Sequence, residues 1–290
     1  MILYDLFIAP FADFDFMRRG LAGTLALALG ATPVGVFLLL RRMSLMGDAV
    51  SHAILPGAAL GYLACGLSLG AMTAGGIIAG LIVVFAAGLV ARTSNLKEDA
   101  SLAAFYLLSL AVGITIVSQS GRNLDLLHVL FGSVLALDDA SLLLIAAIGS
   151  ISLFGTAILF RPLVLESFDP AFLRAVSRMS PLAHYGFLLL AVLNLVSGFH
   201  ALGTLMAVGI MILPAASARL WARRLSTMLA LAAGLALVAG VAGLLLSFHT
   251  NVPAGPAIIL VCGLAYLVSL LAAPSGLIAP RWPKHQHLSS

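Results

Sequence analysis

MSLMGDAVSHAILPGAALGYLACGLSLGAMTAGGIIAGLIVVFAAGLVA, residues 43–91, decides the fold of this chain, because it runs for 49 residues with a single charged side chain. That charge is Asp48, and the stretch also holds one histidine, His52. Its length and low polarity predict two helices in a lipid bilayer, which each need about 20 apolar residues. A carboxylate inside such a segment costs several kcal/mol by insertion scales, so we expect Asp48 to have a function.

The composition of the whole chain agrees with a membrane protein. Of its 290 residues, 62% are hydrophobic and 9% are charged, and the mean hydropathy is +1.14. A soluble protein carries roughly a quarter charged residues, so too little polar surface is left to cover a soluble fold. The loops are short, and no polar segment could fold separately. We therefore expect an all-α polytopic membrane protein in which residues 1–290 form one transmembrane domain.

Nine apolar segments are bounded by charges or turn residues and are predicted to be helices: about 21–40, 44–66, 70–91, 100–118, 139–160, 183–198, 201–217, 226–247 and 256–273. The sixth and seventh are short and separated only by Phe199 and His200, so one span plus a broken half-helix is the alternative. The prediction is thus eight or nine spans. Segment 124–137 is too short to span comfortably and is predicted to be a re-entrant or interfacial helix.

Small residues predict where these helices approach one another closely. Gly57 and Gly61 form a GxxxG pair, and so do Gly76 and Gly80. Such pairs allow close helix packing in lipid. Helices there associate through van der Waals contacts, because lipid tails are as apolar as the side chains. We expect these glycines to pack against neighbouring helices; hinges are the alternative.

The positions of lysine and arginine predict the orientation in the membrane. With alternating spans, twelve of the 15 Lys and Arg residues fall on the side of loop 161–180, and Arg18, Arg19 and Arg122 fall on the other. The positive-inside rule places loop 161–180 in the cytoplasm, the N-terminus outside and the C-terminus inside. The net charge of +4 does not indicate a nucleic-acid partner, because the basic residues stand singly or in pairs at the ends of apolar runs.

Asp48 and His52 lie four residues apart, which puts them one turn apart on the same face of a helix. A carboxylate and an imidazole at this spacing can bind one transition-metal ion together. The structural alternative is that Asp48 caps the N-terminus of its helix at the cytoplasmic interface and that His52 is a satisfied core residue.

Pro56 and Pro214 predict interruptions in two membrane helices. Pro56 has no N–H, so the carbonyl of His52 loses its helical partner and becomes an acceptor near the face of Asp48. Pro214 lies inside the apolar segment 205–218. Broken helices that line a cavity expose ligands at the membrane midplane of transporters, so both prolines are candidates for helix breaks or gating.

The loop ESFDPAFLRAVSR, residues 166–178, is the longest polar segment away from the termini. Asp169 and Pro170 predict a helix start, with Asp169 at the N-cap and Pro170 at the first helical position. Apolar residues would then form one face of a short amphipathic helix: Phe168, Phe172, Leu173 and Val176. This helix either lies on the membrane surface or docks a cytoplasmic partner.

Five stretches together suggest a family: GDAVSHAILPG at 47–57, LHVLFGSVLAL at 127–137, FDPAF at 168–172, LMAVGIMILPAASA at 205–218 and NVPAGPAIIL at 251–260. In this order they resemble motifs of the ABC-3 metal permeases, the membrane subunits of ABC importers for zinc, manganese and iron. The first stretch is the most specific. The resemblance covers essentially the whole chain, from about residue 17 to 275.

The resemblance implies eight or nine spans, two permease copies working with two cytoplasmic ATPases, and metal delivered by an extracytoplasmic binding protein. It implies a multi-pass protein of the bacterial inner membrane, in contact with lipid, with no permanently bound cofactor. Asp48 and His52 would be pathway ligands for the transported zinc, manganese or iron. The ATPase contact would lie in residues 166–175, with these candidates: Glu166, Phe168, Asp169, Pro170 and Phe172. His200 and His249 match no motif and are predicted to be structural or interfacial.

An intramembrane enzyme is one other class of function. The GLSLG stretch, Gly66–Gly70, matches the GxSxG motif of hydrolases, but that motif needs a strand, a turn and a helix. Here it joins two predicted membrane helices. Ser51 and His52 point about 100° apart on a helix, so they cannot share the hydrogen bond of a nucleophile and its base.

A secondary metal transporter driven by protons or other ions is the stronger alternative. It needs several ionisable residues in separate spans, whereas this chain has one carboxylate in the membrane interior, Asp48. An ATP-driven importer instead needs a phosphate-binding GxxxxGK[ST] loop, and this sequence has none. We therefore expect ATP hydrolysis on a separate chain and no enzymatic activity of this one.

Overall fold

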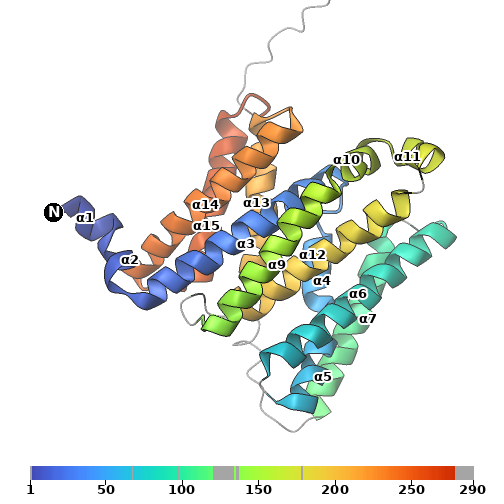
Figure 1. The fold of residues 1–290 in the computed structure, drawn as a ribbon, viewed down its shortest axis with the longest axis horizontal. Coiled ribbons are helices and arrows are strands. Elements are labelled where there is room, and N and C mark those ends of the chain that lie inside the picture. The colour runs from blue at the N-terminus through green and yellow to red at the C-terminus, as the bar shows by residue number, and fades with distance from the viewer. Residues whose placement is uncertain are drawn as a thin grey trace, which may run out of the picture.

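The computed structural model describes residues 2–66, 68–96, 98–119, 134, 137–177 and 179–277, and these ranges contain helices and no strand (Figure 1). The helices are α1 (Ile2–Phe7), α2 (Ala9–Asp13), α3 (Asp15–Leu40), α4 (Met46–Ala53), α5 (Leu55–Cys65), α6 (Leu69–Thr93), α7 (Glu98–Gln119), α9 (Asp139–Ile158), α10 (Phe160–Phe168), α11 (Pro170–Val176), α12 (Ser180–Leu202), α13 (Thr204–Trp221), α14 (Leu225–Thr250) and α15 (Ala254–Ala272). Eight of them are long and apolar enough to cross a membrane: α3, α6, α7, α9, α12, α13, α14 and α15. The predicted all-α polytopic membrane fold is confirmed.

The predicted apolar segments match these helices closely, with two differences. The predicted segment 44–66 is two consecutive helices, α4 and α5, and neither alone is long enough to span. The segments around 183–217 form two separate helices that meet at Gly203, whose φ is +90°. Their break therefore lies at this glycine and not at Phe199 and His200, which continue α12. Of the predicted segment 124–137, only residues 134 and 137 are described.

The centre of the fold is made by α3 and α12, which are the most buried of the eight long helices. The first packs against α9, α12, α13 and α14, and the second also contacts α6 and α9. The short helix α4 lies against α6, α7, α12 and α13, so the segment that carries Asp48 and His52 is held among four other helices. A cluster of buried apolar side chains from most of these helices forms one continuous core.

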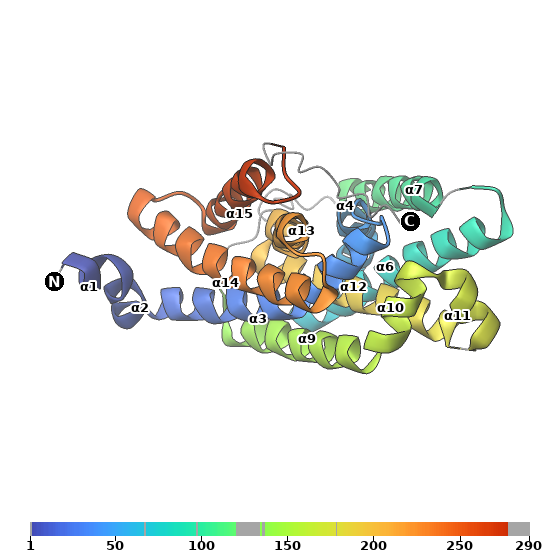
Figure 2. The ribbon, with the colours of Figure 1, turned by 90° about the horizontal axis from the view of Figure 1, so that it is seen from above.

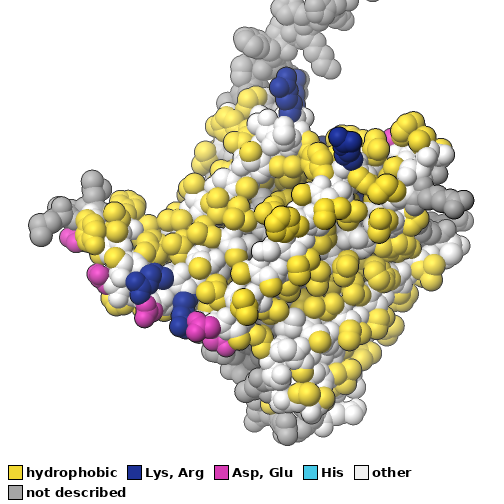
Figure 3. Space-filling view, in the orientation of Figure 1, with side chains coloured by type: hydrophobic (Ala, Val, Ile, Leu, Met, Phe, Trp, Pro, Cys, Tyr) yellow, Lys and Arg dark blue, Asp and Glu magenta, His cyan; other side chains and the backbone are white. Residues whose placement is uncertain are grey.

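The helix pairs α1–α2 and α10–α11 lie at opposite ends of the molecule. Both Figure 1 and Figure 2 place α1 and α2 at one end and α10 and α11 at the other. The face seen in Figure 3 carries apolar side chains across its middle and charged side chains near its two ends. This distribution is expected of a chain that crosses a bilayer, because charges are stable only near water.

Helices α5 and α6 pack with their backbones in contact. A Cβ atom built on Gly57 would lie 2.0 Å from the carbonyl oxygen of Gly75, and one on Gly61 would lie 2.4 Å from that of Ala71. The prediction that Gly57 and Gly61 serve close packing is confirmed. Gly57 meets Gly75 and Gly61 meets Ala71, whereas Gly80 faces Val192 of α12.

Gly57→Ala should therefore destabilise the fold, because its methyl group would meet backbone that cannot move without separating α5 from α6. We expect a loss of about 1–3 kcal/mol, as for other overpacked cores, seen as a lower melting temperature of the purified protein in detergent. Gly234→Ala is the matched control, since a Cβ at Gly234 meets no atom within 4 Å. Equal melting temperatures of the two variants would contradict the close contact.

Candidate metal site and coupling segment

Asp48 and His52 lie side by side on α4. Asp48 is in the first turn of this helix and His52 in its last, and Asp48 Oδ1 is 3.7 Å from His52 Nε2. The four-residue spacing thus brings the two side chains together, as predicted. Both could reach one ion placed between them, with an oxygen from one residue and a nitrogen from the other.

The surroundings of the pair do not match the structural alternative. The N-cap residue of α4 is Leu45, so Asp48 does not occupy the cap position. The side chain of Asp48 is 69% exposed and that of His52 is 38% exposed, so neither is buried in the core. The ring of His52 leans against Tyr106 of α7, with 6.2 Å between the ring centroids.

The rest of α4 explains why this face stays open. Six of its eight residues are buried: Met46, Gly47, Ala49, Val50, Ser51 and Ala53. Gly47 permits the approach of α13, because a Cβ there would lie 3.3 Å from side-chain carbons of Val208 and Ile212. The helix is therefore anchored on its apolar face, and Asp48 and His52 are its only residues outside that buried set.

The helix is interrupted next to Pro56, as predicted. α4 ends at Ala53, and α5 begins at Leu55 with Pro56 in its first turn. The N–H of Ile54 points to the carbonyls of Val50 and His52, so the His52 carbonyl does not stand open as expected. The carbonyl of Ala53 instead accepts a hydrogen bond of 2.9 Å from Ser109 Oγ of α7.

The predicted break at Pro214 is wrong. Helix α13 runs without interruption from Thr204 to Trp221, and Pro214 is buried inside it. A proline removes one helical hydrogen bond, which packing against neighbouring helices can compensate in a membrane. Here α13 packs against α3, α14 and α15, and this packing holds the helix together across the proline. A role of Pro214 in gating stays a prediction.

One chain offers a metal ion two side-chain ligands at this site, Asp48 and His52. Among the described residues, no group of three or more His, Cys, Asp and Glu side chains could hold a metal ion. Structural zinc sites use four protein ligands, so a carboxylate and an imidazole alone would bind an ion weakly. This arrangement suits an ion in transit better than a permanently bound one.

The second candidate site is the α10–α11 segment. Asp169 caps α11 as predicted, accepting a 2.9 Å hydrogen bond from the N–H of Phe172, and the helix begins at Pro170. The side chains of Phe168 and Phe172 are exposed, while Leu173 is buried and anchors the helix. The segment thus presents two aromatic rings on a capped and anchored turn.

Glu166 differs from the rest of this segment. Its side chain is only 5% exposed, and its Oε1 lies 3.7 Å from Nη2 of Arg41 at the end of α3. Nη2 of Arg41 also lies 3.5 Å from Nδ1 of His184. The carboxylate points into the protein and is not available for the ATPase contact that the resemblance implied. Sequence reasoning treated Arg41 only as an orientation signal and missed His184.

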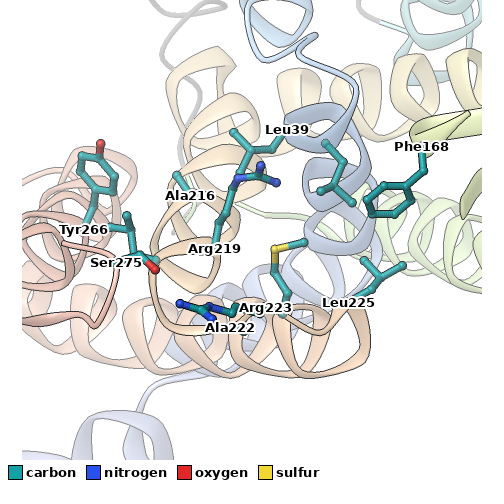
Figure 4. Close-up of a pocket in the computed structure, with 12 residues that line it drawn as sticks. Leu39, Phe168, Ala216, Arg219, Ala222, Arg223, Leu225, Tyr266 and Ser275 are labelled. Carbon is teal, nitrogen blue, oxygen red and sulfur yellow. The ribbon is translucent and has the colours of Figure 1, made fainter. Parts of the chain in front are cut away.

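A pocket of about 580 Å³ opens beside the same end of the molecule (Figure 4). Its wall carries the guanidinium groups of Arg219 and Arg223, and Phe168 lies at one side of it. Neither Asp48 nor His52 lines this pocket. It is therefore separate from the candidate metal site, and it borders the α10–α11 segment.

The remaining histidine predictions concern His249 and His200. His249, at the end of α14, has its Nε2 3.0 Å from the carbonyl oxygen of Leu6 in α1. It links the N-terminal helix to the bundle, which is the structural role predicted for it. The side chain of His200 lies outside the described residues.

Comparison with known proteins shows which proteins are similar to this chain in sequence and in fold. Residues 13–273 match the ABC 3 transport family. The chain is 37% identical to the manganese import system permease protein ScaB of Streptococcus gordonii over 92% of this chain and 95% of that protein. It is 30% identical to the chelated iron transport system membrane protein YfeD of Yersinia pestis, over 93% of this chain and 89% of that one.

A solved structure agrees with the sequence matches. A chain of PsaBC from Streptococcus pneumoniae, in complex with a Fab, superposes with a TM-score of 0.81 and 33% sequence identity. The match covers 95% of this chain and 97% of that chain. The similarity therefore extends through all the spans and is not confined to one motif.

The hydrogen bond at the α4–α5 break yields a test of how that break is held. Ser109→Ala leaves the Ala53 carbonyl without this partner, and we expect a loss of about 1–3 kcal/mol in the free energy of unfolding. Ser118→Ala is the control on the same helix, because its exposed hydroxyl donates a hydrogen bond to the carbonyl of Thr115 within α7. Unfolding by sodium dodecyl sulfate would measure both, and equal stability would show that the bond does not contribute.

Proposed function

We infer what this chain does from the premise that it belongs to the ABC 3 transport family. It is the membrane permease subunit of an ATP-binding-cassette importer that moves divalent transition-metal ions. The relatives that support this function are named as permeases for manganese or as membrane proteins of iron transport. The observation that carries it is the similarity to a manganese permease over more than nine-tenths of both chains.

Manganese is the metal that we propose first, followed by iron, because the relatives reported above are named for these two metals; zinc was also expected from the sequence. The ion would pass Asp48 and His52, which offer a hard oxygen and a borderline nitrogen. That ligand pair suits Mn²⁺ and Fe²⁺ as well as Zn²⁺. Weak binding by two groups supports transport, because a site on a pathway must release what it admits.

Three partners follow from this function as proposals. Cytoplasmic ATPase subunits would hydrolyse ATP, because the chain has no phosphate-binding loop of its own. An extracytoplasmic protein would deliver the metal. The open face of α4 supports a homodimer, because a second permease copy would cover this face and so enclose the path. The N-terminus would lie outside a bacterial inner membrane and the α10–α11 end inside, as the distribution of lysine and arginine favours.

Loss of either metal ligand should abolish uptake. In vesicles that contain the chain, its ATPase and its binding protein, we expect ATP-dependent uptake of radioactive manganese to fall to background in Asp48→Asn and in His52→Ala. Each variant keeps the buried face of α4, so assembly with the ATPase should survive. Uptake at the wild-type rate in both variants would exclude this pair from the path.

Asp138→Asn is the matched control for the charge change. Asp138 is a carboxylate at the N-cap of α9, where it accepts a hydrogen bond from the N–H of Ser141. Asparagine caps helices about as well as aspartate, so this variant removes a charge and keeps the local structure. We expect it to transport manganese normally.

The exposed aromatic rings of the α10–α11 segment should bind the ATPase. Aromatic side chains in the middle of an interface contribute much of its binding energy, so Phe168→Ala should weaken ATPase binding about tenfold. Phe154→Ala is the control, because both side chains belong to residues that are 69% exposed and Phe154 lies on the long helix α9. Co-purification of the ATPase and the ratio of uptake to ATP hydrolysis would measure the effect; equal behaviour of the two variants would contradict it.

A further inference from the structure

Arg41 and Glu166 form a buried ion pair that links segments far apart in the sequence. Arg41 follows the last residue of α3, and Glu166 lies near the end of α10. Their side chains are 7% and 5% exposed, and the distance from Nη2 to Oε1 is 3.7 Å. The guanidinium also lies over the ring of Phe187, 4.8 Å from its centroid, and beside Nδ1 of His184. Three helices, α3, α10 and α12, therefore meet at one charge.

A pair of this kind is poorly explained by stability alone. Removing two ions from water is expensive, and replacing a buried ion pair by apolar side chains of similar size is often neutral or stabilising. What an ion pair can add is a preferred position, because the two buried charges attract each other only where the two segments bring them together. The pair therefore fixes α10 against the end of α3.

The two residues belong to segments with different proposed functions. Glu166 lies three residues before Asp169, which caps α11, the helix proposed to meet the ATPase. Arg41 lies at the start of the short connection from α3 to α4, which carries Asp48 and His52. The ion pair thus joins the proposed ATPase-binding segment to the connection that leads into α4, the helix with the proposed metal ligands.

The connection from Arg41 to α4 is tied down by backbone hydrogen bonds. The N–H of Met43 donates to the carbonyl of Leu38 at 2.9 Å, and the N–H of Met46 donates to that of Met43 at 3.0 Å. The side chains of both methionines are buried. A connection that is short, hydrogen-bonded and anchored in the core resists deformation. When Arg41 is displaced, α4 should therefore move with it.

We propose that the Arg41–Glu166 ion pair transmits movement of the α10–α11 segment to α4, so that ATP hydrolysis is coupled to opening of the metal site. Both residues would act as positioning residues, since their side chains are buried and pair with each other. The proposal rests on the proposed function, because it takes the movement of α11 to be driven by an ATPase. It also gives Glu166 a role that its burial permits.

The test is an apolar replacement of the pair, Arg41→Met/Glu166→Met, in the complex with ATPase and binding protein. This variant removes both charges, so we expect it to fold and assemble. Manganese taken up per ATP hydrolysed should fall about tenfold, within the usual range of coupling between sites. Arg19→Gln/Asp139→Asn is the control: this exposed ion pair, at 3.1 Å, joins the other end of α3 to α9. It should leave the ratio unchanged.

Conservative variants keep the proposal testable if the apolar pair does not fold. Arg41→Lys, Glu166→Asp and their combination retain both charges but lengthen or misalign the contact. If the residues act as one unit, the combined variant should lose no more uptake per ATP than the worse single variant. Losses that multiply, or an unchanged ratio in all three variants, would overturn the proposal.

The same assay separates this proposal from the function on which it rests. A wild-type complex without ATP-dependent uptake of manganese or iron would contradict the proposed function. A wild-type complex that transports, together with an assembled apolar variant of equal uptake per ATP, would contradict only the ion-pair proposal. A lower melting temperature with an unchanged ratio would assign the pair a structural role and also overturn it.

Discussion

The cost of placing a charge in apolar surroundings is the constraint on which the rest of this structure depends. It limits the long helices to few ionisable residues and moves most charges to the two ends of the molecule. Where a charge is retained, the structure handles it in one of two ways. Arg41 and Glu166 are buried and form an ion pair with each other, whereas Asp48 lies with His52 on the open face of a helix whose six other residues are buried. The first arrangement fixes positions, and the second leaves a carboxylate ready for a cation.

The spans were predictable because the bilayer imposes a length on each apolar segment. Local chemistry was predictable for a similar reason: the spacing of Asp48 and His52, and the capping of α11 by Asp169, depend on residues less than two turns apart. The two prolines show where such reasoning stops. Pro56 lies beside a helix break and Pro214 does not, because the outcome is decided by packing around each helix, which the sequence near a proline does not contain.

The role of Glu166 is a second case of a non-local outcome. Its position next to an exposed, capped helix favoured a contact with a partner, and its neighbour Phe168 is indeed exposed. The ion-pair partner of Glu166 is Arg41, which follows α3 in a distant part of the chain and also contacts His184 and Phe187 of α12. Arg41 itself looked like an ordinary orientation signal at the end of a span. No property of either sequence neighbourhood indicates that the two side chains meet.

The division of labour between α4 and the α10–α11 segment has a consequence for how such a permease can vary. The groups proposed to meet the ion lie on one open face of α4, and the groups proposed to meet the ATPase lie on exposed turns near α11. Since the two surfaces share only a buried connection, a change at the metal site need not alter the ATPase contact. Fold and coupling can then stay the same while the ligands around the path change, because function resides in sites carried by a fold. The similar chains that are named for manganese and for iron agree with such a separation.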